Sequence, residues 1–105
     1  MKTIITFGYN LPTQLPEGCP VIDCRVIKNP YSNYKHDPEG ARRVVRSDPF
    51  FEQLVKRGTE ALLMYDTVAV GCLYGVHRSG TVAEEILHRM LNLGFDATID
   101  KRGKA

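Results

Sequence analysis

A short apolar run, followed by a glycine-rich loop and a helical pattern, constrains the fold of this chain more than any other feature. The run, residues 67–71, reads Thr-Val-Ala-Val-Gly, which is typical of a central parallel strand buried on both faces. The loop, residues 71–79, reads Gly-Cys-Leu-Tyr-Gly-Val-His-Arg-Ser. Thr81 and Glu84 then fit a capping box, which predicts a helix that begins between residues 79 and 81. Together these segments predict a strand–loop–helix unit.

Other segments of the chain also carry strand signals. Residues 3–7 and 21–26 are rich in β-branched and apolar side chains and predict two early strands. Gly94 predicts the end of the preceding helix, and residues 95–99 after it predict a last strand. Strands that alternate with helices imply parallel crossovers. We therefore expect one α/β domain over residues 1–105, with three layers and a mostly parallel central sheet of about four strands between flanking helices.

A second helix is predicted ahead of the apolar run. Asp48 and Pro49 have the chemistry of an N-cap and a first helical residue, and the helix should end near residue 65. Residues 28–40 contain prolines, glycine and asparagines and predict an irregular loop. The helical period predicts two buried stripes, formed by Phe51, Leu54, Val55, Leu62 and Tyr65 and by Val82, Ile86, Leu87, Met90 and Leu91.

Composition excludes several classes of protein. The chain has 105 residues, 43% of them hydrophobic, and a formal net charge of +2, which suits one globular domain. It contains neither an apolar run of membrane-spanning length nor a signal-peptide pattern, so we expect a cytoplasmic protein without a membrane partner. The three cysteines, Cys19, Cys24 and Cys72, are an odd number, which argues against a disulfide framework in a chain without a secretion signal. They form no Cys-x-x-Cys pair, so we expect no metal site, and we expect no cofactor.

The loop over residues 71–79 has the chemistry of an anion-binding site. A helix N-terminus offers unpaired amides and the positive end of the helix dipole. Arg78 adds a guanidinium that matches phosphate oxygens, and His77 adds a second donor. The simpler alternatives are a turn that serves geometry alone and an Arg78 that pairs with Glu84 or Glu85. We expect a phosphate-like anion to be bound by Cys72, Leu73, Tyr74, Gly75, His77, Arg78 and Ser79.

A second polar group precedes the irregular loop. Asp23 and Arg25 alternate with apolar neighbours, so a strand would place both on one face. We expect Asp23, Arg25 and Asn29 to support the site, either by preorganising the glycine-rich loop or by reaching the ligand. The alternative is an exposed ion pair that contributes little. A turn after Asn29 would carry Tyr31 and Tyr34 toward the pocket.

Most of the chain resembles the C-terminal domain of the RNase adapter protein RapZ. That family carries a loop of the form Gly-Cys-x-x-Gly-x-His-Arg-Ser followed by Ala-Glu, an earlier Asp-x-Arg and Asn-Pro motif, and a first strand that ends in Ser-Phe-Gly. Thr6, Phe7 and Gly8 are similar to the end of that strand. The two main motifs are matched by Gly71, Cys72, Gly75, His77, Arg78, Ser79, Ala83 and Glu84, and by Asp23, Arg25, Asn29 and Pro30.

The resemblance implies a domain that binds a phosphorylated small molecule, in the family an amino-sugar phosphate, and that acts as an RNA-binding or regulatory adapter in an oligomer. Leu73 and Tyr74 depart from the small, polar residues of the family loop, and residues 100–102 lack the family's His-Arg-Asp pattern. If Leu73 and Tyr74 filled the pocket, no ligand could bind there, and the remaining interpretation would be a purely structural interaction module. No Walker A sequence of the family's preceding P-loop domain occurs here, so ATP or GTP use is not carried over.

A cysteine-dependent phosphatase is the alternative function. Cys72 and Arg78 have the Cys-x5-Arg spacing of phosphatases in which a thiolate attacks phosphorus and an arginine holds the oxygens. Asp37 and Asp48, each followed by proline, are candidate general acids. Against catalysis, the loop lies deep in the chain and Gly71, not a histidine, precedes the cysteine. We favour binding over catalysis.

Basic residues gather in two further places. Arg42, Arg43 and Arg46 precede the long helix, and residues 101–104 form a basic tail that we expect to fray. Such clusters contact the phosphate backbone of RNA or form a solvated face. An RNA partner and a homo-oligomer are therefore hypotheses that rest mainly on the family resemblance.

Overall fold

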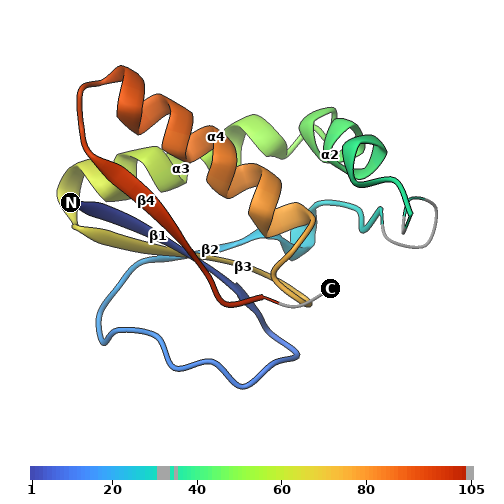
Figure 1. The fold of residues 1–105 in the computed structure, drawn as a ribbon, viewed down its shortest axis with the longest axis horizontal. Coiled ribbons are helices and arrows are strands. Elements are labelled where there is room, and N and C mark those ends of the chain that lie inside the picture. Colours follow the sequence, from blue (N-terminus) through green and yellow to red (C-terminus); the bar gives the residue numbers. More distant parts are fainter. Residues whose placement is uncertain (31–33, 35, 104–105) are drawn as a thin grey trace.

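The computed structural model of the protein describes residues 1–30, 34 and 36–103, and in these residues four strands form one sheet (Figure 1). The strands are β1 (Lys2–Gly8), β2 (Val21–Asp23), β3 (Thr67–Cys72) and β4 (Ala97–Lys101). They lie in the order β2-β3-β1-β4, and each neighbouring pair is parallel. The predicted α/β fold with a sheet of about four mostly parallel strands is confirmed.

The helices cover one face of this sheet. They are α2 (Pro38–Arg46), α3 (Phe51–Met64) and α4 (Arg78–Asn92), and all lie on the same side in Figure 1. The main core fills the space between sheet and helices, where Val68 and Val70 of β3 pack with Leu62 of α3 and Ile86 of α4. Burial of these apolar side chains is the main stabilising contribution to the arrangement.

Irregular chain covers the other face of the sheet. Residues 9–20, which connect β1 to β2, contain neither helix nor strand and run below the sheet in Figure 1. Leu15 and Cys19 of this segment pack on a smaller core of Ile5, Phe7 and Ala69. Because Ala69 faces this segment while its neighbours in β3 face the helices, β3 is buried on both faces, as its sequence predicts.

The two central strands send the chain to opposite faces of the sheet. From β1 the chain leaves on the face without helices and returns to β2 at one edge. From β3 it enters α4 on the helical face and returns to β4 at the other edge. Such a reversal between neighbouring parallel strands is a topological switch point, where α/β folds form a crevice at the carboxyl ends of the strands. The glycine-rich loop starts at this point.

Two predicted segments differ in the structure because side chains hold the backbone locally. The strand predicted over residues 21–26 ends at Asp23, and a 3-10 helix, η1 (Cys24–Val26), follows because the Asp23 carboxylate accepts the amide of Arg25 at 2.9 Å. The loop predicted over residues 28–40 is wrong at its end, where α2 begins. Asp37 caps α2 by accepting the Gly40 amide at 2.9 Å, and Pro38 is its first residue.

The ends of the two long helices also differ from prediction. The Asp48 carboxylate accepts the amide of Phe50, so Asp48 caps a turn and α3 begins only at Phe51. Tyr65 lies beyond α3, and both Tyr65 and Leu91 are about half exposed rather than buried. The capping box proposed for Thr81 is wrong, because its hydroxyl donates to the His77 carbonyl from inside the first turn of α4.

The basic tail is held to the sheet over the part that the structure describes. Lys101 belongs to β4, and the Arg102 amide donates to the Thr6 carbonyl at 2.8 Å. The Arg102 guanidinium also binds the Asp100 carboxylate and the Gln14 carbonyl. The prediction that residues 101 and 102 fray is therefore wrong, while Tyr31 and Lys104 lie outside the described residues. Within the described part of the chain, no helix has the length and apolar character needed to cross a membrane.

Candidate functional site

The glycine-rich loop is fixed against the end of β1. The amides of Tyr9 and Asn10 donate to the carbonyls of Cys72 and Leu73 at 2.8 and 2.9 Å. A side chain at Gly8 would meet the Tyr74 backbone at 2.7 Å, so this approach needs glycine. The loop therefore continues the pairing of β1 with β3 beyond the last residues of the strands.

Gly75 makes the sharp turn that leads into α4. Its φ of +75° lies in the left-handed region, and a Cβ at this position would lie 2.5 Å from the carbonyl carbon of Phe7. Gly103 approaches the same residue from the tail after β4. Since neither the conformation nor the space admits a side chain, the turn depends on glycine.

Cys72 lies at the start of the loop with its thiol directed at Ser79. The Cys72 Sγ donates to the Ser79 Oγ at 3.3 Å, and both residues are buried. Burial raises the pKa of the Cys72 thiol, but the Ser79 hydroxyl, the amides of Ser79 and Gly75 and the charge of Arg78 together lower it more, so that the pKa lies below the ordinary value. The same donors that favour a thiolate would favour a bound anion.

Arg78, the first residue of α4, holds two distant parts of the chain together. It is only 5% exposed, and its Nη1 donates to the carbonyls of Ile27 at 3.0 Å and Arg25 at 3.3 Å. One nitrogen of the guanidinium thus anchors η1 and the residue after it, and the expectation that Arg78 binds a phosphate-like anion stays a prediction. The alternative that Arg78 pairs with Glu84 or Glu85 is wrong, since these carboxylates pair with Arg42 and Arg89.

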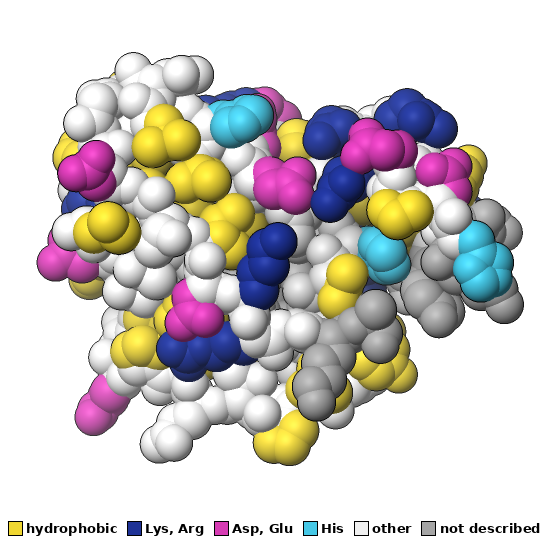
Figure 2. Space-filling model, viewed as in Figure 1, with side chains coloured by type: hydrophobic (Ala, Val, Ile, Leu, Met, Phe, Trp, Pro, Cys, Tyr) yellow, Lys and Arg dark blue, Asp and Glu magenta, His cyan; other side chains and the backbone are white. Residues whose placement is uncertain are grey.

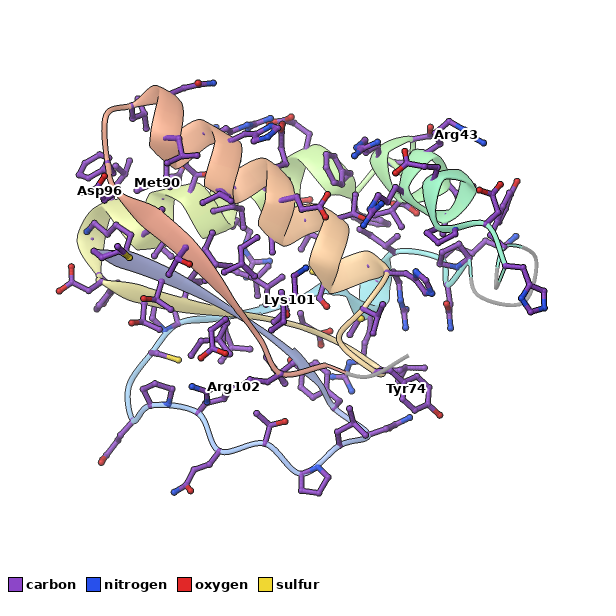
Figure 3. All side chains as sticks on the ribbon, viewed as in Figure 1. Arg43, Tyr74, Met90, Asp96, Lys101 and Arg102 are labelled. Carbon is purple, nitrogen blue, oxygen red and sulfur yellow. The ribbon has the colours of Figure 1, made fainter. Side chains whose placement is uncertain are left out.

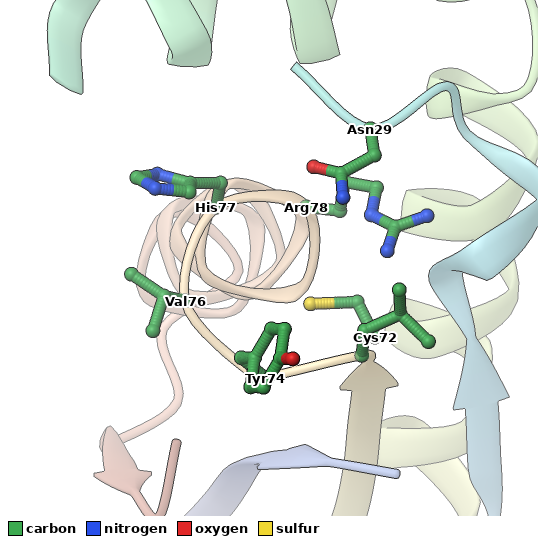
Figure 4. A pocket seen from close by; sticks show the side chains of 7 residues that line it. Asn29, Cys72, Tyr74, Val76, His77 and Arg78 are labelled. Atoms are coloured by element: carbon green, nitrogen blue, oxygen red, sulfur yellow. The ribbon is translucent and has the colours of Figure 1, made fainter. Parts of the chain in front are cut away.

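A pocket of about 330 Å³ opens beside the loop (Figure 4). In the view of Figure 4, the side chains of Asn29 and Arg78 lie on one side of the α4 axis, whereas His77 and Val76 lie on the other. Tyr74 is half exposed and does not fill the cavity. The residues that line the pocket are Asn29, Cys72, Leu73, Tyr74, Val76, His77 and Arg78.

Most of the predicted site residues meet at this pocket. Two of the loop residues do not line it: Gly75 supplies the turn, and Ser79 is fully buried against Cys72. Val76 lines the pocket and was missed, because an apolar residue in a polar loop carries no chemical signal of its own. Burial and the nearby charge of Arg42 lower the pKa of His77, which favours its neutral form at neutral pH.

Asp23 and Arg25 lie behind the pocket rather than in it. Their side chains form a two-pronged ion pair with a shortest distance of 2.7 Å, and both are nearly half exposed. The hydrogen bond from Arg25 holds the pKa of Asp23 below its usual range. Arg25 also lies 3.7 Å from the ring centre of Tyr9, a contact that sequence reasoning missed. The pair positions η1, and through the Arg25 carbonyl it supports Arg78.

The two candidate general acids serve as backbone caps. The carboxylate of Asp37 accepts the Gly40 amide, and that of Asp48 accepts the amides of Phe50 and Lys28. Neither aspartate lines the pocket, and none of its seven described lining residues carries a carboxylate. In the described part of the chain, no cluster of three or more His, Cys, Asp or Glu side chains could hold a metal ion.

The family model described as the RapZ C-terminal domain matches residues 2–104 of this chain. The chain is 33% identical over 116 residues to a nucleotide-binding protein of Caldicellulosiruptor bescii and 30% identical over 118 residues to one of Acidiphilium cryptum. It is 28% identical over 116 residues to a nucleotide-binding protein of Streptomyces griseus. These matches cover 95% of this chain in each case, but only 40%, 38% and 35% of the three relatives, so the chain spans little more than a third of their length.

Proposed function

Because the chain belongs to the RapZ C-terminal domain family, we propose that it binds a small phosphorylated metabolite, of the amino-sugar phosphate class, in the pocket beside Cys72. The pocket lies at the switch point of the sheet and at the N-terminus of α4, where backbone amides and the helix dipole favour an anion. The observation that carries the proposal is that a buried cation, Arg78, and six further loop and turn residues line one cavity at that point.

The size and chemistry of the pocket favour a sugar phosphate. A cavity of about 330 Å³ lies at the small end of the range for ligand pockets, which suits a monosaccharide phosphate better than a dinucleotide. Arg78 and the start of α4 would receive the phosphate, while Asn29 and His77 offer hydrogen bonds to sugar hydroxyl or amino groups. The curated relatives are called nucleotide-binding proteins, but the sequence of this chain contains no Walker A element.

A direct test measures ligand-induced thermal stabilisation of the chain. Glucosamine 6-phosphate and glucose 6-phosphate should raise the melting temperature, whereas ATP and GTP should not. A ligand that binds the folded chain and is present at 100 times its Kd raises the free energy of unfolding by about 2.7 kcal/mol, which a melting curve detects. Asn29→Ala and His77→Gln should weaken the effect. His88→Gln is the matched control, because His88 is exposed farther along α4. If no phosphorylated sugar stabilises the wild-type chain, the proposed function is refuted.

Phosphatase activity is the second candidate, and one observation favours it. The Cys72 thiol contacts the Ser79 hydroxyl and has a lowered pKa, as a nucleophilic thiol requires. Protonation of the leaving group needs an acid, and neither Asp37 nor Asp48 lines the pocket. We therefore propose binding without turnover. Hydrolysis of p-nitrophenyl phosphate that disappears in Cys72→Ser would favour the phosphatase instead.

We also propose that the domain acts as an adapter that contacts RNA as a homo-oligomer. Arg42 and Arg43 lie on α2 with Glu39 and Asp37 beside them, so the charges on this helix are mixed, as Figure 2 shows. One copy therefore offers a weak surface for RNA, and several copies would be needed to gather enough positive charge. Retardation of a structured RNA in a gel, lost as salt rises and weakened in Arg46→Gln, would support this role.

A further inference from the structure

A second cavity, of about 220 Å³, lies on the β4 side of the same loop. Its walls come from the loop at Gly75, from the first turn of α4 at Gly80, from Thr6 of β1 and from Lys101 of β4. A side chain at Gly80 would meet no atom within 4 Å, so the helix start is open toward space. The function proposed for the pocket beside Cys72 gives this cavity no role, although Gly75 and Glu84 of the loop motif line it.

Thr6 is the feature that points to a ligand. It is only 2% exposed, and it lines the cavity from the middle of the sheet. Among the residues that the structure describes, its hydroxyl makes no hydrogen bond. No fully enclosed side-chain oxygen there lacks a partner, so the hydroxyl keeps some exposure at the cavity that Thr6 lines. A hydroxyl on a side chain this buried is usually hydrogen bonded, either to the protein or to a group in the space that it faces. A bound group with an oxygen acceptor would supply the missing partner.

Lys101 brings a positive charge to the same cavity. Thr6 and Lys101 are register partners of the parallel strands β1 and β4, so their side chains leave the sheet on the same face. Figure 3 labels Lys101 at the end of β4, beside the sheet below α4. In the described residues Lys101 forms no ion pair, and the carboxylate of the adjacent Asp100 is bound by Arg102 at 2.9 Å. The Lys101 ammonium is thus available to an anion.

The remaining charged groups of the cavity largely neutralise each other. Arg42 of α2 lies 2.8 Å from a Glu39 oxygen and 3.5 Å from a Glu84 oxygen. Glu84 is the one carboxylate among the described lining residues. Because Glu39 and Glu84 both face Arg42, Lys101 is the cation of the cavity with which no carboxylate of the described residues forms an ion pair, and the N-terminal end of the α4 dipole adds to its field.

We propose that this second cavity binds a small oxyanion of phosphate size, held by the Thr6 hydroxyl, the Lys101 ammonium and the start of α4. The shared chemistry is that of a phosphoryl group, whether of free phosphate or of a small metabolite. The cavity lies on the other side of the loop from the pocket beside Cys72, and of the described residues that line either space, Val76 alone lines both. Both sites use the positive end of the α4 dipole, but the side chains that define the second one, Thr6 and Lys101, take no part in the function proposed above.

Amide NMR spectra of the whole chain, titrated with potassium phosphate at constant ionic strength, test the inference. Ile99 and Gly103 report on the second cavity, and Cys72 and Tyr74 report on the first pocket. Phosphate should shift the amides of Ile99 and Gly103 in the wild-type protein. A parallel titration with glucose 6-phosphate separates free phosphate from a metabolite phosphoryl group, because the source that fits should bind more tightly at the same reporters.

Two variants remove single groups from the cavity. Thr6→Val keeps the β-branched shape in the strand and removes the hydroxyl, and Lys101→Gln removes the charge at the end of β4. Each should weaken the binding reported by Gly103 roughly three- to tenfold, which corresponds to the loss of one hydrogen bond or ion pair. Lys56→Gln, an exposed position on α3, is the matched charge control and should bind as the wild type does.

The outcomes separate this inference from the proposed function. If neither source of phosphate shifts Ile99 and Gly103, or if Thr6→Val and Lys101→Gln bind as tightly as the wild type, the second site is refuted. A well-dispersed amide spectrum shows that a variant is folded, so that weaker phosphate binding by that variant is not caused by misfolding. Shifts at Ile99 and Gly103 without shifts at Cys72 and Tyr74 would support the second site and contradict the first.

Discussion

Replacement of Arg78 by lysine should destabilise the fold even though the positive charge is kept. In the structure the Arg78 Nη1 donates to two carbonyls, those of Ile27 at 3.0 Å and Arg25 at 3.3 Å. A lysine ammonium is a compact donor without the planar fork of arginine, so it reaches one of these carbonyls at most. The other carbonyl then loses its charged donor in a region that is largely closed to water.

The size of the effect follows from these contacts. A hydrogen bond to a charged group contributes about 1.5–3 kcal/mol, and the longer of the two bonds lies at the weak end of that range. We therefore expect Arg78→Lys to lower the free energy of unfolding by about 2 kcal/mol. In a domain of this size such a loss lowers the melting temperature by about 8–16 °C.

Urea unfolding followed by circular dichroism measures this free energy. Arg25→Lys is the matched control, because it makes the same substitution at a nearly half-exposed side chain that pairs with Asp23. Exposed ion pairs contribute little, so the control should lose clearly less stability than Arg78→Lys. Equal losses in the two variants would refute the conclusion that Arg78 anchors the segment after η1.

Three further predictions concern the loop. Gly75→Ala should destabilise the chain by about 2 kcal/mol or more, as measured in urea, because the left-handed conformation and the contact with β1 both exclude a methyl group. The absorbance of the Cys72 thiolate at 240 nm should appear below the pH range of an ordinary thiol and shift to higher pH in Ser79→Ala, while Cys24, whose pKa burial raises, ionises only at higher pH. Because burial lowers the pKa of His77, this side chain becomes a cation only at pH values below the usual histidine range. Sulfate binding measured by calorimetry should therefore tighten as the pH falls through those lower values, and His77→Gln should lose this gain. Sulfate keeps its charge over these pH values, so a gain that persists in His77→Gln would show that another group is responsible.

The strand–loop–helix unit could be predicted from sequence because its signals are local. The apolar run of β3, the glycines of the loop and the helical period of α4 each lie within one continuous segment. The same local chemistry was misjudged at Asp37 and Pro38, an N-cap and first-residue pair that begins α2 inside a segment predicted as loop. Breaker residues and helix-start residues are the same residue types, so their effect depends on whether a helical period continues after them.

By itself, the sequence determined that this is an α/β domain with a glycine-rich loop between a buried strand and a helix, and it named most of the residues around the pocket. Only the tertiary structure decided what the charged groups do. Arg78 meets carbonyls 51 and 53 positions away in the chain, and the register of β1 and β4 places Lys101 beside Thr6. Such contacts depend on strand register and on the packing of helices against the sheet, and no local pattern records either of them.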